Sequence, residues 1–491
     1  MADKTVQWTQ QQSQAIRARG RDVLVTASAG TGKTAVLSGR CVEIVADPGI
    51  CPDVGAILVL TFTDMAAEEM RSRIAALLRQ RARQTGNAHL ARQVVLLQGA
   101  DISTIHSFCK RLITEFFHEI DLDPTFAVLD ADEVRLLKAE TLERTIEWAW
   151  TQEDLAGPLR RLLTGRTLAG PNGFLSQIVE ISDLLDTVID RQGWRRRAVD
   201  AVSAEPLEGS LAGEHLRMVA EHVREILDRS RHAATLCRGH EQATKWLDAW
   251  EQPFIAPLAA ALALLEKGRF DAFLEALAVI EKPRTNKPKG LDGPVASIID
   301  ELSQKVKKRF DALRDLAILN PDYIGQIRGA VCEQTQVLVE LVRQFDAFYQ
   351  QTKRSLNGLD FADLEHHALR LLCEDPTAEE LKCSTTALAM RDRYRAIFVD
   401  EYQDINPVQK AILRMLAAGD NVFFVGDVKQ SIYAFRGAEP DIFVSDLRSA
   451  AVHDAEGTAL RVDLNTNFRS RREILDFVNH VFNRTMTEGV S

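Results

Sequence analysis

The sequence of 491 residues predicts an α/β protein whose parallel β-sheet is split by a long helical insertion. Two observations predict this fold class. Six short apolar runs are rich in β-branched residues, which is typical of strands that a parallel sheet buries on both faces. Helical patterns separate most of these runs, as the crossover connections of a parallel sheet require. The runs cover residues 22–27, 56–61, 101–105, 395–400, 421–426 and 460–465.

The region between the third and fourth runs is predicted to be mostly helical. Residues 131–149, 211–229 and 330–352 show helical periodicity, and strand signals in this region are few. We therefore expect the α/β domain to be interrupted in sequence. The predicted divisions are 1–110 for its first part, 111–355 for the insertion, 356–458 for its second part and 459–491 for a final segment.

The composition is that of an ordinary globular protein, with 46% hydrophobic and 26% charged residues. A net charge of −10 does not exclude nucleic acid as a ligand, because phosphate contacts depend on local charge. Seven cysteines are scattered without the paired spacing of a disulfide framework or a zinc site, which favours a reduced, cytoplasmic compartment. The polar N-terminus does not resemble a signal peptide, and no apolar run is long enough for a membrane span.

The segment that follows the first run has the spacing of a phosphate-binding P-loop, with alanine in place of the first glycine. Successive backbone N–H groups in a glycine-rich turn, together with a helix N-terminus, can hold an anionic phosphate. Lys33 adds a positive charge at the β- and γ-phosphates of ATP, and the Thr34 hydroxyl can hold Mg²⁺. The predicted ATP-binding residues are Ala27, Ser28, Ala29, Gly30, Thr31, Gly32, Lys33 and Thr34.

A pair of acidic residues ends the fourth apolar run. In the segment 394–405, YRAIFVDEYQDI, an apolar strand leads directly into Asp400 and Glu401. The first carboxylate can hold the Mg²⁺ ion of the nucleotide, and the second can orient and activate the attacking water. Two acids at a strand end could also form a solvated turn, but their occurrence behind a P-loop favours the catalytic interpretation.

Several other segments carry distinctive motifs. They are WTQQQSQAI (8–16), LVLTFTDMAAEEMRSRI (58–74), STIHSFC (103–109), VGDVKQSIYAFRGAEPDIF (425–443) and LNTNFRS (464–470). With the P-loop and the acid pair, they resemble the UvrD/Rep branch of superfamily 1 DNA helicases, and within it the AddA and RecB-like helicase subunits. The wording VGDVKQSIY, the segment DLDPTFAVLD (121–130) and the segment LDFADL (359–364) favour the AddA type.

The resemblance implies a RecA-like P-loop NTPase domain, a helical insertion similar to the family's domain 1B, and the start of a second RecA-like domain at 459–491. It also implies roles at the nucleotide. Gln12 would read the adenine edge with both amide groups, and Phe468 would stack on the adenine. Gln430 would sense the γ-phosphate, and Arg469 would reach it across the cleft between two domains. Lys33, Glu401, Gln430 and Arg469 are then the predicted catalytic residues.

The resemblance further implies a track for single-stranded DNA. Its predicted residues are Thr61, Phe62, Thr63, His106, Tyr433, Phe435 and Arg436. An exposed aromatic ring can stack on a base, so Phe62 suits this role, although packing in the core is an alternative. His106 could be a polar contact or a structural residue. Basic clusters at 195–197 and 305–309 could touch phosphates, but a solvated helix face is the simpler interpretation.

The predicted function is therefore an ATP-dependent 3′-to-5′ DNA helicase or translocase subunit of an AddAB-like helicase–nuclease in the repair of double-strand breaks by recombination. Its implied partners are DNA and an AddB-like second subunit. Two alternatives stay open, a UvrD-type single-subunit repair helicase and an ATP- and DNA-binding module without productive turnover. The motifs of a second motor domain and of a nuclease do not occur before Ser491. We expect the 491-residue chain alone to bind Mg·ATP weakly, hydrolyse it poorly and unwind no DNA.

Overall fold

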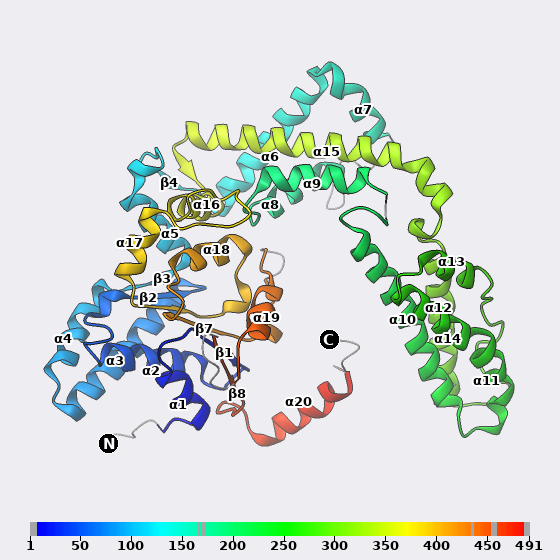
Figure 1. Cartoon of the computed structure of the whole chain (residues 1–491), viewed down its shortest axis with the longest axis horizontal. Coiled ribbons are helices and arrows are strands. Elements are labelled where there is room, and N and C mark those ends of the chain that lie inside the picture. Colours follow the sequence, from blue (N-terminus) through cyan, green and yellow to red (C-terminus); the bar gives the residue numbers. More distant parts are fainter. Residues whose placement is uncertain are drawn as a thin grey trace. The chain divides into compact units, whose positions relative to one another are not determined.

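The computed structural model describes residues 7–164, 167, 173–205, 207–433, 437–452 and 459–485. The chain divides into two compact units, which are described separately (Figure 1). The first unit comprises Met1–Ile146, Ala169–Arg191 and Gln344–Ser491. The second unit comprises Glu147–Leu168 and Gln192–Arg343.

The first unit contains a six-stranded sheet in which every neighbouring pair of strands is parallel. The strand order is β3-β2-β6-β7-β1-β8, so strands from both ends of the chain alternate within one sheet. The predicted α/β class and the six predicted strands are confirmed, with ends that differ by one or two residues. The strands are β1 (Val23–Ala27), β2 (Ile57–Thr61), β3 (Asp101–Thr104), β6 (Ala396–Val399), β7 (Val422–Gly426) and β8 (Leu460–Leu464).

Both faces of this sheet are covered by helices, which explains why the strands are apolar throughout. Side chains along a strand alternate between faces, so Val23 and Val25 pack into one core and Leu24 into the other. Helices α1 to α4 cover the first face, and α5 with α16 to α19 covers the second (Figure 1). The helices of this unit are α1 (Gln10–Arg17), α2 (Lys33–Val45), α3 (Asp64–Thr85), α4 (Ala88–Leu96), α5 (Ile105–Glu115), α8 (Phe174–Leu185), α16 (Phe361–Leu372), α17 (Thr385–Arg393), α18 (Pro407–Leu416), α19 (Pro440–Ser449) and α20 (Arg472–Thr485).

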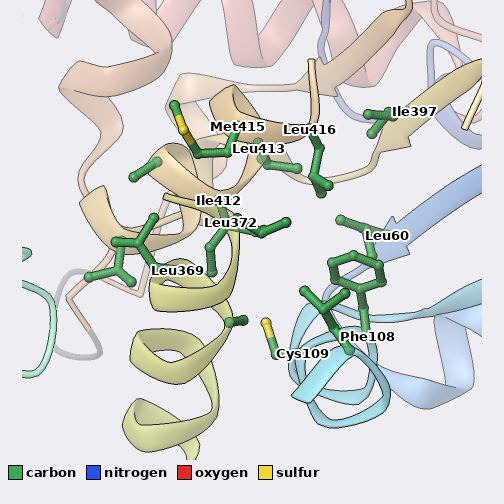
Figure 2. Close-up of a cluster of buried hydrophobic side chains, with 14 of the residues drawn as sticks. Leu60, Phe108, Cys109, Leu369, Leu372, Ile397, Ile412, Leu413, Met415 and Leu416 are labelled. Atoms are coloured by element: carbon green, nitrogen blue, oxygen red, sulfur yellow. The ribbon is translucent and has the colours of Figure 1, made fainter. Parts of the chain in front are cut away.

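The core on the second face joins the two parts of the split domain. Figure 2 shows Leu60 of β2 and Phe108 of α5, which precede the insertion, in one cluster with residues that follow it. Those residues include Leu369 of α16, Ile397 of β6 and Ile412 of α18. Burial of each such side chain contributes about 1.5–3 kcal/mol. The domain therefore requires both parts of the sequence to form its core.

A short second sheet lies at the ends of the predicted insertion. The strands β4 (Ala127–Val128) and β5 (Gly358–Leu359) pair in parallel, and the Ala127 amide donates to the Asn357 carbonyl at 2.9 Å. A Cβ atom at Gly358 would lie 2.9 Å from the Leu129 side chain, so glycine is needed for this approach. The sequence did not predict this pair because two-residue strands carry no periodic signal.

The last strand differs from its predicted place. The segment 459–491 was expected to begin a second domain, but β8 is an edge strand of the first sheet. It pairs with β1 from Leu460 opposite Val23 to Leu464 opposite Ala27. Its apolar side chains lie in the same core as α1 and α2. The boundary of the first sheet therefore falls after β8 rather than at 459.

The second unit is helical, as the sequence predicts for this region. Trp246 and Trp250 stack at 4.6 Å between ring centroids within its core. Their indole N–H groups donate to the carbonyls of Asn286 and Thr285, which hold the loop between α13 and α14 against that core. Its helices are α7 (Glu153–Leu163), α9 (Arg191–Ser203), α10 (Ala212–Cys237), α11 (Thr244–Trp250), α12 (Ala256–Glu266), α13 (Phe270–Ala278) and α14 (Pro294–Arg314).

Two long helices, α6 (Ala131–Thr151) and α15 (Pro321–Ser355), belong partly to each unit. The compact second unit is thus smaller than the predicted insertion 111–355, because α8 and the outer ends of α6 and α15 group with the first unit. Over the described parts of the chain, no helix combines the length and the apolar character that crossing a membrane requires.

Candidate nucleotide and nucleic-acid site

The P-loop connects β1 to α2 and is shaped by two glycines. Gly30 has a φ of +80° and Gly32 a φ of +90°, conformations that cost other residues about 1–2 kcal/mol. The Thr31 hydroxyl donates to the Ser28 carbonyl at 2.7 Å and fixes the turn. Helix α2 begins at Lys33, so its N-terminal amides and their positive dipole end lie at the loop. This arrangement can bind a phosphate.

The Lys33 ammonium contacts two of the predicted catalytic side chains. Its Nζ lies 3.0 Å from Glu401 Oε2 and donates to Gln430 Oε1 at 3.4 Å. Glu401 follows β6 with a φ of +52°, an unusual conformation for a residue with a side chain. Strained backbone of this kind is found mainly at functional sites. The structure therefore brings together three residues that are far apart in the sequence.

A hydrogen-bond network that the sequence did not predict holds these residues. Gln403 is buried, and its Nε2 donates to Glu401 Oε2 and to Asp404 Oδ2, each at 3.0 Å. The Gln403 Oε1 accepts from the Asp427 amide at 2.9 Å, and Asp427 Oδ2 accepts from Gln430 Nε2 at 2.8 Å. The only sequence signal was the polar ending of the 394–405 segment. The network joins the acid pair to the loop that carries Gln430.

Asp400 is poorly solvated and lies next to another acid. Burial, and then repulsion from Glu401, raise the pKa of Asp400 to about 6. Asp400 and Thr34 line the same cavity of about 360 Å³, together with Glu401 and Gln430. A carboxylate and a hydroxyl are hard oxygen donors, which Mg²⁺ prefers. A nearby divalent cation would also offset the repulsion between the two acids, so these residues fit a magnesium ion.

The turn that contains Phe468 and Arg469 packs directly on the P-loop. Asn467 Nδ2 donates to the Ala29 carbonyl at 2.7 Å, and the Phe468 amide donates to the Gly30 carbonyl at 2.8 Å. The Asn467 Oδ1 accepts from the Arg469 amide at 2.8 Å. A Cβ on Gly30 would lie 2.7 Å from the Arg469 Cβ. The pairing of β8 with β1 explains this proximity, and it leaves the Phe468 ring 61% exposed.

Gln12 lies at the P-loop, but its amide is engaged within the chain. Its Nε2 donates to the Thr31 carbonyl at 3.1 Å, and its Oε1 accepts from the Thr9 amide at 3.1 Å. Thr9 and Gln12 thereby form the capping box of α1. Gln12 ties α1 to the P-loop in this structure. Its predicted contact with adenine, which would use both amide groups, stays a prediction.

Residues of the predicted DNA track line a second cavity of about 500 Å³ beside the acid pair. Phe62 is 37% exposed, and its ring packs against Tyr433 with centroids 4.5 Å apart. The Thr61 hydroxyl donates to the Thr63 carbonyl, and the Thr63 side chain caps α3. Phe62 and Tyr433 thus present aromatic surface to the cavity, whereas the two threonines shape the backbone around it.

His106 lies at the same cavity at the start of α5, with a side chain 35% exposed. Its Nε2 lies 2.9 Å from Glu365 Oε1, and its ring packs on Phe361 at 4.8 Å between centroids. Glu365 is buried on α16. Burial pushes the pKa of Glu365 up, but hydrogen bonds from His106 and two amides outweigh it and hold the pKa below its usual value. No sequence pattern had pointed to this carboxylate.

Other predicted nucleic-acid contacts have less structural support. Phe435 and Arg436 lie outside the described residues. In the basic cluster of α14, Lys305 pairs with Glu301 at 2.6 Å, and Arg309 pairs with Glu225 at 3.1 Å. Lysine and arginine side chains that are paired in this way favour the interpretation as a structural helix face.

A parallel sheet with a P-loop at the end of one strand and an acid pair at the end of another defines a P-loop nucleotide-binding protein. The sheet order and the site match the RecA-like domain that the sequence predicted. Residues 8–451 match the family described as UvrD/REP helicase N-terminal domain. The chain belongs to this family, and the predicted resemblance to UvrD/Rep helicases is confirmed.

Curated relatives make the relationship more specific. The chain is 35% identical to an ATP-dependent helicase/nuclease subunit of Geobacillus thermodenitrificans, over 98% of the chain and 40% of that relative. It is also 35% identical to the protein of the same name from Moorella thermoacetica, over 98% of the chain and 35% of that relative. The protein of this name from Anoxybacillus flavithermus is again 35% identical, with 99% and 41% covered. The chain thus spans less than half the length of these relatives, and the predicted similarity to AddA-type proteins is confirmed.

Proposed function

We propose that this chain is the part of an AddA-like helicase subunit that binds Mg·ATP and single-stranded DNA. One observation carries the proposal. A single cavity of about 360 Å³ is lined by Thr34, Asp400 and Gln430 of the nucleotide set and by Phe62 and Tyr433 of the DNA set. A ligand-dependent shift at the acid pair can therefore be felt at the aromatic pair, which is what a translocating motor requires.

At the nucleotide, the P-loop amides and Lys33 bind the phosphates, and Thr34 and Asp400 hold Mg²⁺. Bound Mg²⁺ neutralises charge on the phosphates during transfer. Glu401 orients and activates the attacking water. Gln430 senses the γ-phosphate through its place between Lys33 and Asp427. The contact of the Asn467 turn with Ala29 and Gly30 supports roles for Phe468 and Arg469 at the nucleotide.

On the DNA side, Phe62 and Tyr433 provide stacking surface for bases. Stacking on an aromatic ring contributes about 1–3 kcal/mol per base. Thr61 and Thr63 support the track, and His106 contacts the DNA from the opposite element. Phe62→Ala should therefore weaken binding of a fluorescent oligo(dT) by about tenfold or more.

For the whole protein, kinship with the helicase/nuclease subunits supports a 3′-to-5′ motor that acts with an AddB-like partner in recombinational repair of DNA ends. The same kinship supports a cytoplasmic location. Because the chain covers about two fifths of such relatives, these properties belong to the proposal for the complete protein.

The test is binding of a fluorescent ATP analogue and of oligo(dT) by the purified chain in Mg²⁺, followed by phosphate release with and without DNA. Lys33→Ala should weaken nucleotide binding about tenfold or more, because it removes a charge-assisted contact. Lys110→Ala, an exposed lysine of the same unit, is the control. Binding without turnover would favour the alternative of a module without productive hydrolysis. Absence of both nucleotide and DNA binding would refute the proposal.

A further inference from the structure

A buried carboxylate links the DNA track to the helix that follows the acid pair. Glu365 on α16 is 3% exposed and accepts three side-chain hydrogen bonds. His106 Nε2 lies 2.9 Å from Oε1, and Gln409 Nε2 donates to the same oxygen at 2.7 Å. Asn406 Nδ2 donates to Oε2 at 2.9 Å. Three separate segments of the first unit thus meet at one charged group.

Two of these donors begin helix α18. Asn406 is the N-cap residue of α18, and Gln409 completes the capping box. The Asn406 side chain accepts from the Gln409 amide at 2.8 Å, while the Asn406 amide donates to Gln409 Oε1 at 3.3 Å. The N-terminus of α18 therefore holds Glu365 through groups that are already fixed by the cap.

The connection from α18 back to the acid pair is short and well packed. Only a 3₁₀ turn, Tyr402–Asp404, and Ile405 separate Glu401 from Asn406. The Tyr402 ring stacks on Phe424 of β7 at 4.0 Å, and its hydroxyl donates to Asp446 at 2.9 Å. A shift of the acid pair on nucleotide binding would therefore move the cap of α18 rather than be absorbed by a loose loop.

We infer that Glu365 is a positioning residue that orients His106 toward DNA and couples its position to the nucleotide site through Asn406 and Gln409. The inference rests on the proposed function. His106 suits this role because one ring nitrogen is committed to Glu365, and the other has no partner among the described residues. A buried carboxylate favours a fixed, charge-assisted contact, so loss of its charge should loosen the histidine.

The first experiment measures the dissociation constant of oligo(dT) by fluorescence anisotropy for the wild type, Glu365→Gln, His106→Ala and the double variant. We expect each single change to weaken binding about tenfold, because each disrupts a contact that involves a charged group. The double variant should be no weaker than His106→Ala, because Glu365 acts through His106. Wild-type affinity in Glu365→Gln, or losses that multiply in the double variant, would overturn the inference.

The second experiment tests the coupling and leaves the contact between His106 and Glu365 in place. Gln409→Met removes one donor to Glu365, and Lys410→Met, whose lysine contacts Asp446 instead, is the matched control. A non-hydrolysable ATP analogue with Mg²⁺ should change oligo(dT) affinity of the wild type and control by about fivefold or more. In Gln409→Met the affinity without nucleotide should persist and the nucleotide effect should disappear. An undiminished effect would overturn the coupling.

Failure of the inference can be distinguished from failure of the proposed function. A wild-type chain that binds neither ligand refutes the proposed function, whereas a wild-type chain that binds both leaves Glu365 to be judged by its variants. Thermal unfolding and nucleotide affinity show whether Glu365→Gln is folded. If it is not, the Gln409→Met result decides alone, since that change leaves the buried charge with His106 and Asn406.

Discussion

Replacement of Asp400 by asparagine should stabilise the first unit at neutral pH in the absence of metal. Burial and Glu401 raise the pKa of Asp400 from 3.8 to about 6. As the pH rises from 4 to 6, the unfolded chain releases this proton while the folded chain retains it, so the wild type loses stability over that interval. At about 1.36 kcal/mol per pH unit, the loss amounts to about 3 kcal/mol above pH 6. Asparagine avoids it and can still accept from the Glu401 amide, now 3.1 Å from Asp400 Oδ1.

The assay is hydrogen exchange of the β6 peptide in increasing urea without divalent cations, because this peptide reports unfolding of the first unit alone. The stabilisation by Asp400→Asn should be close to zero near pH 4 and reach about 1–3 kcal/mol at pH 7.5. Asp446→Asn is the control with the opposite sign, since Asp446 pairs with Lys410 at 2.8 Å and accepts from Tyr402. A gain that is equal at both pH values, or absent at pH 7.5, would refute the reasoning.

Two further substitutions test the loop and the buried charges of the first unit. Gly30→Ala should weaken binding of a fluorescent ATP analogue, because the new Cβ would lie 2.7 Å from the Arg469 Cβ at a φ of +80°; unchanged affinity would mean that the turn adapts. Lys353→Met should destabilise the unit by about 3–5 kcal/mol, since it leaves the buried carboxylates of Asp360 and Asp363, each 2.6 Å from the ammonium, without their cation. Urea unfolding at pH 7 measures this loss, and wild-type stability would contradict it.

The parts of the fold that the sequence predicted are those with a local physical signal. Strands buried on both faces must be apolar throughout, so all six were visible as runs. The P-loop was visible because its left-handed turn requires Gly30 and Gly32. The acid pair was visible because an apolar strand ends in two carboxylates, an uncommon pattern next to a P-loop.

The rest depends on contacts between distant segments. β8 was recognised as a strand, but only pairing with β1 shows which sheet it joins. Glu365 was missed because a single glutamate in an amphipathic helix usually faces solvent. Its significance follows from donors on α5 and α18 that only the folded chain brings together. Gln12 shows the opposite case, a residue whose local cap was not foreseen behind its predicted role.

The free site carries conformational and electrostatic costs that a ligand can offset. Glu401 adopts a left-handed backbone, which costs about 1–2 kcal/mol, and its carboxylate raises the pKa of the adjacent Asp400. A cation bound at Asp400 would favour the ionised acid, and a phosphate at Lys33 would compete with Glu401 for the ammonium, now 3.0 Å away. Release of Glu401 from Lys33 frees it to hold water. Because Gln403 bonds to Glu401 and α18 follows directly, the same release is transmitted toward Glu365 and the DNA track.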